Sequence, residues 1–548
     1  MLRNRVSFII LSLASAVLLS AGFLFPHCGG FALIGFVPLL WMDRIASRDG
    51  IRHFFWWHYL TFVLWNFFTT FWVCNATFAG GVAASLINAL EMSVIWALFR
   101  LAKRYLKGSL PYVFLAALWI AWERAYYSAE VSWPWLTLGN AFARSTTCVQ
   151  WYEVTGTLGG SLWVWVCNLA VFALSAALQE GRWNSFNKFA RSAAIAGTVL
   201  AFAGPLTASW IRYATYEPVC EGTIDAVAFQ PNFNPYEKFE SMTQAQQNAV
   251  LVDQMTRSMQ GRDSLSPLLF VAPETFISQV VLNSLVSNTD LHTLRSALAM
   301  RPGTNLIVGA DTYQFISGAQ APSYTARPAG VGRWLESYNS AFMMDSTPRV
   351  EIYHKSRLVV GTEKMPWPRL FSKIEKALGG NIMGHCIGQE EVSLLNFIPL
   401  CKDFRQEQQD RIPLGCAVCY ESVYPEYFAS YVAAGAKAMA VITNDAWWGD
   451  TPGYLQHLSY SSLRAIETRR DIVRSANTGV SAFINQRGDV VSRTPWWTRT
   501  SLDGTLSLSS TLTPYVRMGD VTGRACTLIC ILLAVVMIAR RRTEMRRR

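Results

Sequence analysis

The sequence predicts a membrane α-helical bundle joined to one α/β domain. The chain of 548 residues is 51% hydrophobic and only 16% charged, which is too apolar and too poor in charge for an ordinary soluble protein. The apolar residues are also unevenly spread, because long apolar runs fill the first 216 residues and the C-terminus while the middle alternates short runs with polar segments. We predict a transmembrane domain at 1–216, a polar domain at 217–522, and a last helix with a basic tail at 523–548.

About eight apolar runs have the length of membrane helices. They lie at about 5–25, 30–43, 53–75, 79–102, 111–127, 159–179, 191–213 and 523–539. The second run is short, and the fifth carries Glu123 and Arg124. The first run could instead be a signal peptide, but Phe23, Phe25 and Pro26 form a poor cleavage site, so we expect a retained helix.

Positive charge falls on every second loop between these runs. The basic residues of those segments are Arg3 and Arg5; Arg44, Arg48 and Arg52; Lys103, Arg104 and Lys107; Arg182, Lys188 and Arg191; and the tail 540–548, whereas loops 26–29 and 76–80 have no Lys or Arg. The positive-inside rule then places the N-terminus and the tail in the cytoplasm and the polar domain outside it. This pattern explains much of the net charge of +11, and without a stacking or basic-groove motif we expect no nucleic-acid binding.

Strand-like and helix-like segments alternate through the polar domain, which predicts a single α/β domain. The expected strands are Thr223–Phe229, Leu268–Ala272, Asn305–Gly309, Ser340–Asp345, Val350–His354, Leu414–Cys419, Ala438–Thr443 and Val480–Asn485. The expected helices are Ser241–Gly261, Asp290–Met300, Pro425–Ala434 and Gln456–Thr468.

Three reactive side chains stand at the ends of apolar runs. Glu274 follows 268–273, Lys355 follows 350–354, and Cys419 closes 414–419. A thiol with a carboxylate as its base and an ammonium to hold an oxyanion can perform nucleophilic catalysis. Each residue alone has a plainer interpretation: a helix N-terminal carboxylate, an edge lysine and a buried core cysteine.

The cysteines leave two further interpretations open. Cys416 and Cys419 form a C-x-x-C that could be a redox pair, although residues three apart on a strand point to opposite faces. A zinc site would need a second ligand pair, and none stands at suitable spacing. The polar domain holds an odd number of cysteines, so at least one thiol is free, and the disulfide state of Cys220, Cys386, Cys401 and Cys416 is open.

The order of the motifs resembles one family. The motifs are Pro-Glu-Thr at 273–275, Tyr-His-Lys at 353–355, Val-Cys-Tyr-Glu at 418–421, Thr-Asn-Asp-Ala-Trp-Trp-Gly at 443–449 and Arg-Ser-Ala-Asn-Thr-Gly at 474–479. They resemble the nitrilase (carbon–nitrogen hydrolase) superfamily and, with the flanking membrane helices, its apolipoprotein N-acyltransferase branch. The resemblance implies an α-β-β-α sandwich for the polar domain.

The resemblance also implies roles for individual residues. Glu274 would be the general base, Lys355 the stabiliser of the tetrahedral intermediate and Cys419 the nucleophile. Supporting roles would fall to Glu363, Tyr420, Glu421, Asn444 and Asp445, and substrate contacts to Phe239, Trp367, Phe371 and Trp447. The sequence departs from the family at two places. Phe239 replaces a family tryptophan, and the segment 358–363 reads Leu-Val-Val-Gly-Thr-Glu rather than the family's Leu-Val-Pro-Phe-Gly-Glu.

The implied activity is acyl transfer at a membrane surface. A phospholipid would acylate Cys419, and the thioester would then acylate the α-amine of a diacylglyceryl-cysteine at the N-terminus of an apolipoprotein, with no cofactor and no metal. We expect a monomer in a bacterial inner membrane with the catalytic domain on the periplasmic side, and an interfacial lid at 365–371. The alternatives are a membrane-tethered amidase acting on a soluble amide and an inactive transporter or scaffold domain.

Overall fold

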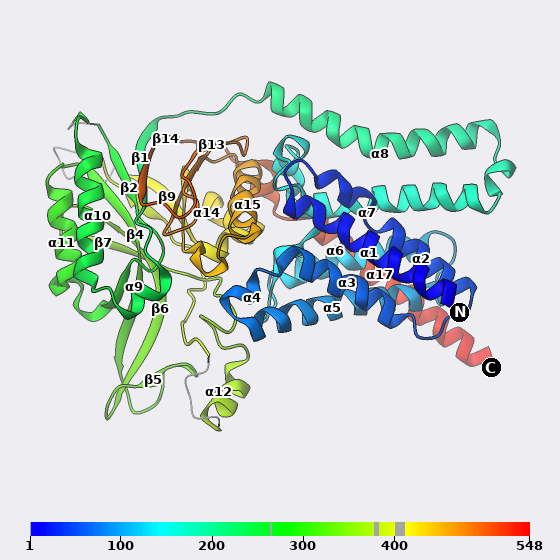
Figure 1. Ribbon diagram of the computed structural model, residues 1–548, viewed down its shortest axis with the longest axis horizontal. Helices are drawn as coiled ribbons and strands as arrows, with labels where there is room; N and C mark the ends of the chain where they lie inside the picture. The colour runs from blue at the N-terminus through cyan, green and yellow to red at the C-terminus, as the bar shows by residue number, and fades with distance from the viewer. Residues whose placement is uncertain (1, 264–265, 378–382, 400–410, 548) are drawn as a thin grey trace. The chain divides into compact units, whose positions relative to one another are not determined.

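A computed structural model describes residues 2–263, 266–377, 383–399 and 411–547. The chain divides into two compact units. A helical unit contains residues 1–216 and 518–548, and a second unit contains residues 217–517 (Figure 1). The chain therefore returns to the helical unit after it has formed the second unit.

The helical unit is built mainly from long helices, with a longer connection of 3₁₀ turns between α6 and α7. Its helices are α1 (Leu2–Leu24), α2 (Val37–Arg48), α3 (Phe55–Thr70), α4 (Val73–Ala76), α5 (Phe78–Tyr105), α6 (Leu110–Tyr126), α7 (Tyr152–Gln179), α8 (Lys188–Thr215) and α17 (Val521–Arg547). The 3₁₀ turns are η1 (Gly29–Ile34), η2 (Pro134–Leu136), η3 (Leu138–Phe142), η4 (Thr146–Cys148) and η5 (Arg182–Ser185).

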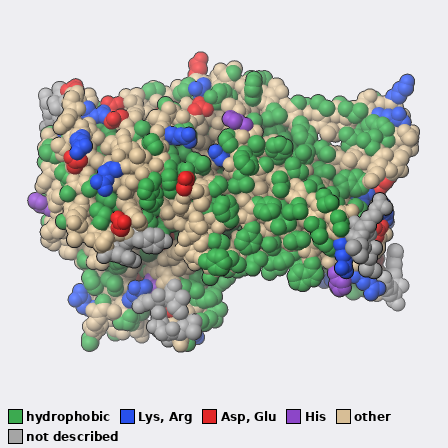
Figure 2. All heavy atoms as spheres, viewed as in Figure 1, with side chains coloured by type: hydrophobic (Ala, Val, Ile, Leu, Met, Phe, Trp, Pro, Cys, Tyr) green, Lys and Arg blue, Asp and Glu red, His purple; other side chains and the backbone are tan. Residues whose placement is uncertain are grey.

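The helical unit has the composition of a membrane bundle. Among the described residues, six helical segments are long and apolar enough to cross a membrane: Arg5–Leu24, Gly29–Arg48, Phe78–Tyr105, Tyr152–Gln179, Lys188–Thr215 and Val521–Arg546. Helices α3 and α6, with 16 and 17 residues, correspond to the other two predicted spans, so the number eight stays a prediction. Figure 2 shows a nearly continuous hydrophobic face over this unit.

Aromatic side chains fill the centre of the bundle. Phe36 stacks on Trp165 with ring centroids 4.3 Å apart and packs edge-on against Trp119.

Two of the predicted membrane spans differ in detail from the helices in the structure. Residues 30–43 form a 3₁₀ turn followed by a helix, not one helix, and α7 begins at Tyr152 with a kink at Gly156, whose φ of 64° breaks the helical geometry.

The second unit contains two mixed β-sheets. The first sheet has the order β14-β1-β2-β4-β6-β5, with β3 paired to β4 and β7 to β6. Its strands are β1 (Thr223–Gln230), β2 (Leu268–Val271), β3 (Ile277–Val281), β4 (Thr304–Ser317), β5 (Arg327–Pro328), β6 (Arg333–Met344), β7 (Val350–His354) and β14 (Thr500–Ser507). The second sheet has the order β13-β12-β11-β10-β9-β8, from β8 (Leu395–Phe397), β9 (Ile412–Val418), β10 (Ala438–Thr443), β11 (Ile472–Ala476), β12 (Ala482–Ile484) and β13 (Val490–Arg493).

Helices cover the outer face of each sheet, and the two sheets meet face to face. The first sheet carries α10 (Gln244–Met259) and α11 (Thr289–Ala299), and the second carries α14 (Pro425–Ala433) and α15 (Pro452–Thr468) (Figure 1). Ser475 on β11 donates to the Phe229 carbonyl on β1 at 2.8 Å, across the two sheets. This arrangement confirms the α-β-β-α sandwich. Shorter helical segments are α9 (Pro235–Glu240), α12 (Pro368–Ala377), α16 (Pro514–Met518), η6 (Leu282–Ser287), η7 (Cys419–Val423) and η8 (Asp445–Trp448).

The core between the first sheet and its helices follows from alternation along the strands. Phe270 on β2 and Leu306 on β4 pack against Leu251 and Met255 of α10 and Leu294 of α11, all of them buried. Apolar side chains at these alternate positions must leave water together, which fixes the register of neighbouring strands. The carboxyl ends of the parallel strands β1, β2 and β4 are thereby brought to one edge.

Candidate active site

The three predicted catalytic residues follow strands of both sheets. Glu274 lies three residues beyond β2, Lys355 comes directly after β7, and Cys419 comes directly after β9. The first two belong to one sheet and the third to the other. The candidate site is therefore formed where the two layers of the sandwich meet, inside the second unit.

Lys355 holds two carboxylates at once. Its Nζ donates to Glu274 Oε1 and to Glu363 Oε1, each at 2.9 Å, and its side chain is 1% exposed. Burial lowers the pKa of the Lys355 ammonium, but the carboxylates of Glu274 and Glu363 outweigh it and hold the pKa well above its usual value. The lysine therefore stays charged at neutral pH.

Asn339 is a site residue that the sequence analysis missed. Its Nδ2 donates to Glu274 Oε1 at 2.8 Å and to Glu363 Oε1 at 2.7 Å, the same oxygens that Lys355 binds. Its backbone carbonyl oxygen also accepts from the Lys355 backbone N–H at 2.8 Å. The only sequence signal is an asparagine just before the apolar run of β6, which alone does not point to a site.

The turn that carries Glu274 requires a close backbone approach. A Cβ at Gly309 of β4 would lie 2.5 Å from the Glu274 Cα, so only glycine fits there. Thr275 has a φ of 49°, and the buried Lys238 Nζ donates to its carbonyl oxygen at 2.5 Å. Burial lowers the pKa of Lys238 to about 8, against the opposite pull of Asp311 and Glu274.

Cys419 sits at a strained turn. Its φ of 51° is in the left-handed region that non-glycine residues rarely adopt. The Cys419 carbonyl accepts from Ser422 Oγ at 2.8 Å and lies 3.1 Å from His457 Nε2, which fixes the turn. Burial and the negative charge of Glu274 raise the pKa of the Cys419 thiol well above its usual range, with Lys355 acting in the opposite direction. The resting sulfur is therefore a thiol and needs a base.

Behind Cys419 lies a buried ionic network. Asp445 Oδ2 accepts from Arg474 Nη2 at 2.7 Å, and Asp445 Oδ1 lies 3.0 Å from His457 Nδ1. Burial raises the pKa of Asp445, but the positive charge of Arg474 and the contact with His457 outweigh this effect and lower the pKa to about 2. Thr443 Oγ1 lies 2.9 Å from Asp445 Oδ1 and 3.2 Å from Cys419 Sγ, so this network reaches the nucleophile.

Glu421 joins the loops that carry Lys355 and Cys419. Its carboxylate accepts from the Ser356 N–H at 2.6 Å, the Val418 N–H at 2.8 Å and the Tyr353 hydroxyl at 2.5 Å. Burial raises the pKa of Glu421 to about 6, even though these hydrogen bonds favour the charged form. Glu421 therefore acts as a brace between the two sheets.

The remaining predicted residues have mixed placements. Tyr420 and Asn444 are buried beside the site, and the Asn444 side-chain oxygen accepts from Asn477 Nδ2 at 3.3 Å. Trp367 is 54% exposed and its ring stacks with that of Phe371, at 6.3 Å between centroids, whereas Trp447 is 36% exposed. Phe239 lies in α9, but its side chain is outside the described residues, as is Cys401.

The departure at 358–363 does not displace Glu363. Its Oε2 accepts from the Val359 N–H at 2.7 Å, and its backbone carbonyl oxygen accepts from the Cys386 N–H at 2.8 Å.

Cys416 and Cys419 are both free thiols, so the C-x-x-C is not a disulfide in this structure. Among the described residues, no group of three or more His, Cys, Asp or Glu side chains could hold a metal ion.

Two family models match consecutive parts of the chain. The model of the apolipoprotein N-acyltransferase N-terminal domain matches residues 15–170, and the carbon–nitrogen hydrolase model matches residues 269–513. The first match lies in the helical unit and the second contains every predicted catalytic residue. The alternative of a membrane-tethered amidase is not favoured, because the helical part has its own match.

Two curated relatives match over nearly the full chain, and a third matches a shorter part at higher identity. An apolipoprotein N-acyltransferase of Chlorobaculum tepidum is 28% identical over 547 residues, which is 97% of both chains. One of Geobacter metallireducens is 22% identical over 559 residues, covering 97% of this chain and 95% of that one. One of Azotobacter vinelandii is 40% identical over 129 residues, covering 23% and 24% of the two chains.

Solved structures of the nitrilase superfamily are also similar to the chain. Saccharomyces cerevisiae Nit3 has 12% sequence identity and a TM-score of 0.35, covering 54% of this chain and 93% of that one. An amidase of Nesterenkonia AN1 has 14% identity and a TM-score of 0.32, covering 56% and 96%. With the two consecutive family matches and relatives that match from end to end, the chain belongs to the apolipoprotein N-acyltransferase family of the carbon–nitrogen hydrolase superfamily.

Proposed function

We propose that this protein is a phospholipid-dependent N-acyltransferase. It moves a fatty acyl chain through a thioester on Cys419 to the α-amine of the N-terminal diacylglyceryl-cysteine of an apolipoprotein, the last step of lipoprotein maturation. The observation that carries the proposal is the buried cluster of Lys355 with Glu274 and Glu363, next to a cysteine at a strained turn. Full-length similarity to proteins named for this activity supports it.

The first half-reaction acylates the enzyme. Glu274 takes the proton of the Cys419 thiol as the sulfur attacks an ester carbonyl of the phospholipid. The Lys355 ammonium and the backbone N–H of Tyr420 hold the resulting oxyanion. The carbon–oxygen bond then breaks, Glu274 returns the proton to the leaving oxygen, and lysophospholipid departs from the thioester. The raised pKa of the Cys419 thiol supports this order, because deprotonation must accompany attack.

The second half-reaction transfers the acyl group. The α-amine of the lipid-modified cysteine attacks the thioester carbonyl, and Glu274 takes a proton from the nitrogen. The carbon–sulfur bond breaks, an amide forms, and the Cys419 sulfur regains its proton. Glu363 and Asn339 act by holding Lys355 and Glu274 in place between the two steps.

The setting of the site explains transfer between two lipids. We place the protein in the bacterial inner membrane as a monomer. Residues 217–517 then lie on the periplasmic side, because basic residues fall on the opposite set of loops. The exposed Trp367 and the partly buried Phe371 form an aromatic pair at the start of α12. This pair enters the membrane interface as part of a lid that admits acyl chains and excludes water.

Intact-mass analysis after incubation with phospholipid alone tests the proposal. The wild type should gain one fatty acyl group that hydroxylamine removes, and a diacylated lipopeptide should discharge it as an amide. Cys419→Ala should gain nothing, whereas Cys416→Ala, which removes the free thiol three residues away on β9, should still be acylated. Absence of an adduct on a folded wild-type protein, or an adduct that survives in Cys419→Ala, would refute the assignment of the nucleophile.

A further inference from the structure

A cavity of about 640 Å³ lies inside the helical unit. Its wall is formed by the last turns of α7, the first turns of α8, the turn η5 between them, and parts of α2 and α6. Small side chains line much of it, among them Ala173, Ala177, Ala193, Ala194, Gly197 and Thr198. The volume is within the range of about 300–1,000 Å³ that holds small organic ligands.

The cavity exists because α7 and α8 pack closely only along part of their length. Near the middle of α8, Trp163 Nε1 donates to the Ala201 carbonyl at 2.7 Å, and near its end Arg212 pairs with Glu153 at 2.5 Å. Toward the start of α8, small side chains on both helices leave the space between them unfilled. A Cβ at Gly197 would have no atom within 4 Å.

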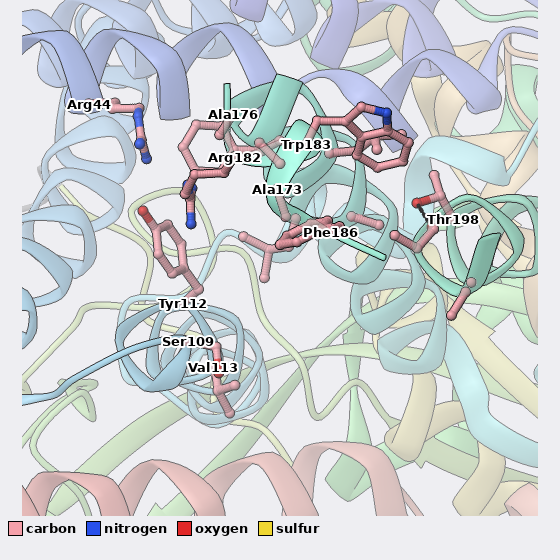
Figure 3. A pocket seen from close by; sticks show the side chains of 18 residues that line it. Arg44, Ser109, Tyr112, Val113, Ala173, Ala176, Arg182, Trp183, Phe186 and Thr198 are labelled. Carbon is pink, nitrogen blue, oxygen red and sulfur yellow. Dashed lines mark hydrogen bonds between the residues drawn. The ribbon is translucent and has the colours of Figure 1, made fainter. Parts of the chain in front are cut away.

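One side of the cavity carries positive charge. Arg44, Arg182 and Tyr112 gather there, and Thr198 lies across from them (Figure 3). Arg182 Nε pairs with Glu180 at 2.7 Å, and Arg44 pairs with the same carboxylate. Two guanidinium groups thus share one carboxylate, which leaves one positive charge. The side chain of Arg182 is 57% exposed and that of Arg44 is 30% exposed, so both can reach a ligand.

The cavity lies at the end of α8 far from Tyr216, where the chain leaves the helical unit. Thr198 and Tyr216 are 18 residues apart along a helix, which corresponds to about 27 Å at 1.5 Å per residue. That is nearly the thickness of the apolar core of a bilayer, about 30 Å. The cavity therefore opens near the leaflet opposite to the one at which the chain enters the second unit, so a lipid there is not in the leaflet that supplies the proposed reaction.

We propose that this cavity is a binding site for a membrane phospholipid that is not a substrate. One acyl chain lies between α7 and α8, and the phosphodiester is bound by Arg44 and Arg182, with the Tyr112 hydroxyl as a further donor. The apolar wall fits a hydrocarbon chain, and the single uncompensated positive charge matches one phosphodiester. The bound lipid supplies the packing that the start of α8 lacks and so fastens this helix to the bundle.

Photo-crosslinking of the full chain in nanodiscs tests the proposal. The nanodiscs contain phosphatidylethanolamine and phosphatidylglycerol with a trace of phospholipid carrying a diazirine in its acyl chain. Labelled peptides should come from 169–177 and 193–198. Gly197→Phe fills the cavity and should lower this labelling by about tenfold. Gly204→Phe, on the same helix but not in the cavity wall, should leave it within about twofold of the wild type.

A charge test separates a lipid site from a free-phosphate site. Arg44→Gln combined with Arg182→Gln should lower the labelling by about tenfold. Arg48→Gln, which removes an exposed arginine from α2, the helix that also carries Arg44, should not lower it. Excess inorganic phosphate should leave wild-type labelling unchanged, and displacement by it would overturn the proposal in favour of a phosphate site. Wild-type labelling that is no stronger in these segments than in the other membrane helices, or equal labelling of Gly197→Phe and Gly204→Phe, would also overturn it. Acyl-enzyme formation at Cys419 reports whether each variant is folded.

Discussion

Replacement of Asn339 by alanine should slow acylation of Cys419 without unfolding the domain. The Asn339 amide makes two hydrogen bonds, of 2.8 and 2.7 Å, to the carboxylates of Glu274 and Glu363. A hydrogen bond to a charged group contributes about 1.5–3 kcal/mol. Water that enters the vacated space restores part of this hydrogen bonding. We therefore expect the transition state to lose the stabilisation of one of the two hydrogen bonds. That loss corresponds to a rate lowered by about 10- to 150-fold.

The assay is the rate of acyl-enzyme formation, followed by intact mass after mixing with phospholipid. Asn396→Ala is the matched control, because the Asn396 amide donates to the Glu351 carboxylate at 3.1 Å in the same domain but outside the site. It should acylate within about twofold of the wild type. Thermal unfolding should be similar for the two variants, since each loses one buried or half-buried amide.

Asn339→Asp distinguishes positioning from simple packing. It adds a carboxylate directly beside Glu274 and Glu363, which share the Lys355 ammonium, so one carboxyl group keeps a proton at neutral pH. The acylation rate should then depend on pH in a way that the alanine variant does not share. If Asn339→Ala acylates as fast as Asn396→Ala, the two short hydrogen bonds have no catalytic consequence and the reasoning fails.

Three further predictions concern the lid, the brace and the ionic network. Trp367→Ser with Phe371→Ser should impair transfer from phospholipid far more than turnover of a short soluble ester, and equal losses would exclude a lid. Because burial raises the pKa of Glu421 to about 6, acylation should fall as the pH drops through about 6 and the carboxylate stops accepting hydrogen bonds. Glu421→Gln should lack this acidic limb. A raised carboxyl pKa means that the folded state binds the proton more tightly, so this group's contribution to stability falls as pH rises through 6 and unfolding does not explain the acidic loss. Asp445→Leu leaves the buried cation of Arg474 unpaired and should cost about 3–5 kcal/mol in thermal unfolding, whereas addition of Arg474→Met should recover much of the loss.

The strand and helix pattern was predictable wherever apolar residues are consecutive or regularly spaced. Segments such as 223–229 and 438–443 correspond to β1 and β10 because each is an apolar run that both layers bury. The sequence did not reveal β11 or β14. Strand β11 carries the buried cation of Arg474, and β14 is an edge strand whose exposed side is polar. Strand β14 pairs with β1, which lies far away in the chain, whereas β11 pairs with β10 and with the nearby β12.

Composition and short motifs are local properties, so the division into apolar helices and one α/β domain and the order of Glu274, Lys355 and Cys419 could be predicted from the sequence. The groups that surround these three residues are brought there by the fold. Asn339 meets Glu274 across 65 residues, and Arg474 meets Asp445 across 29. Such contacts depend on strand register and on the packing of two sheets, which no local pattern encodes. Buried charges come to share hydrogen bonds only once the sandwich has closed around them.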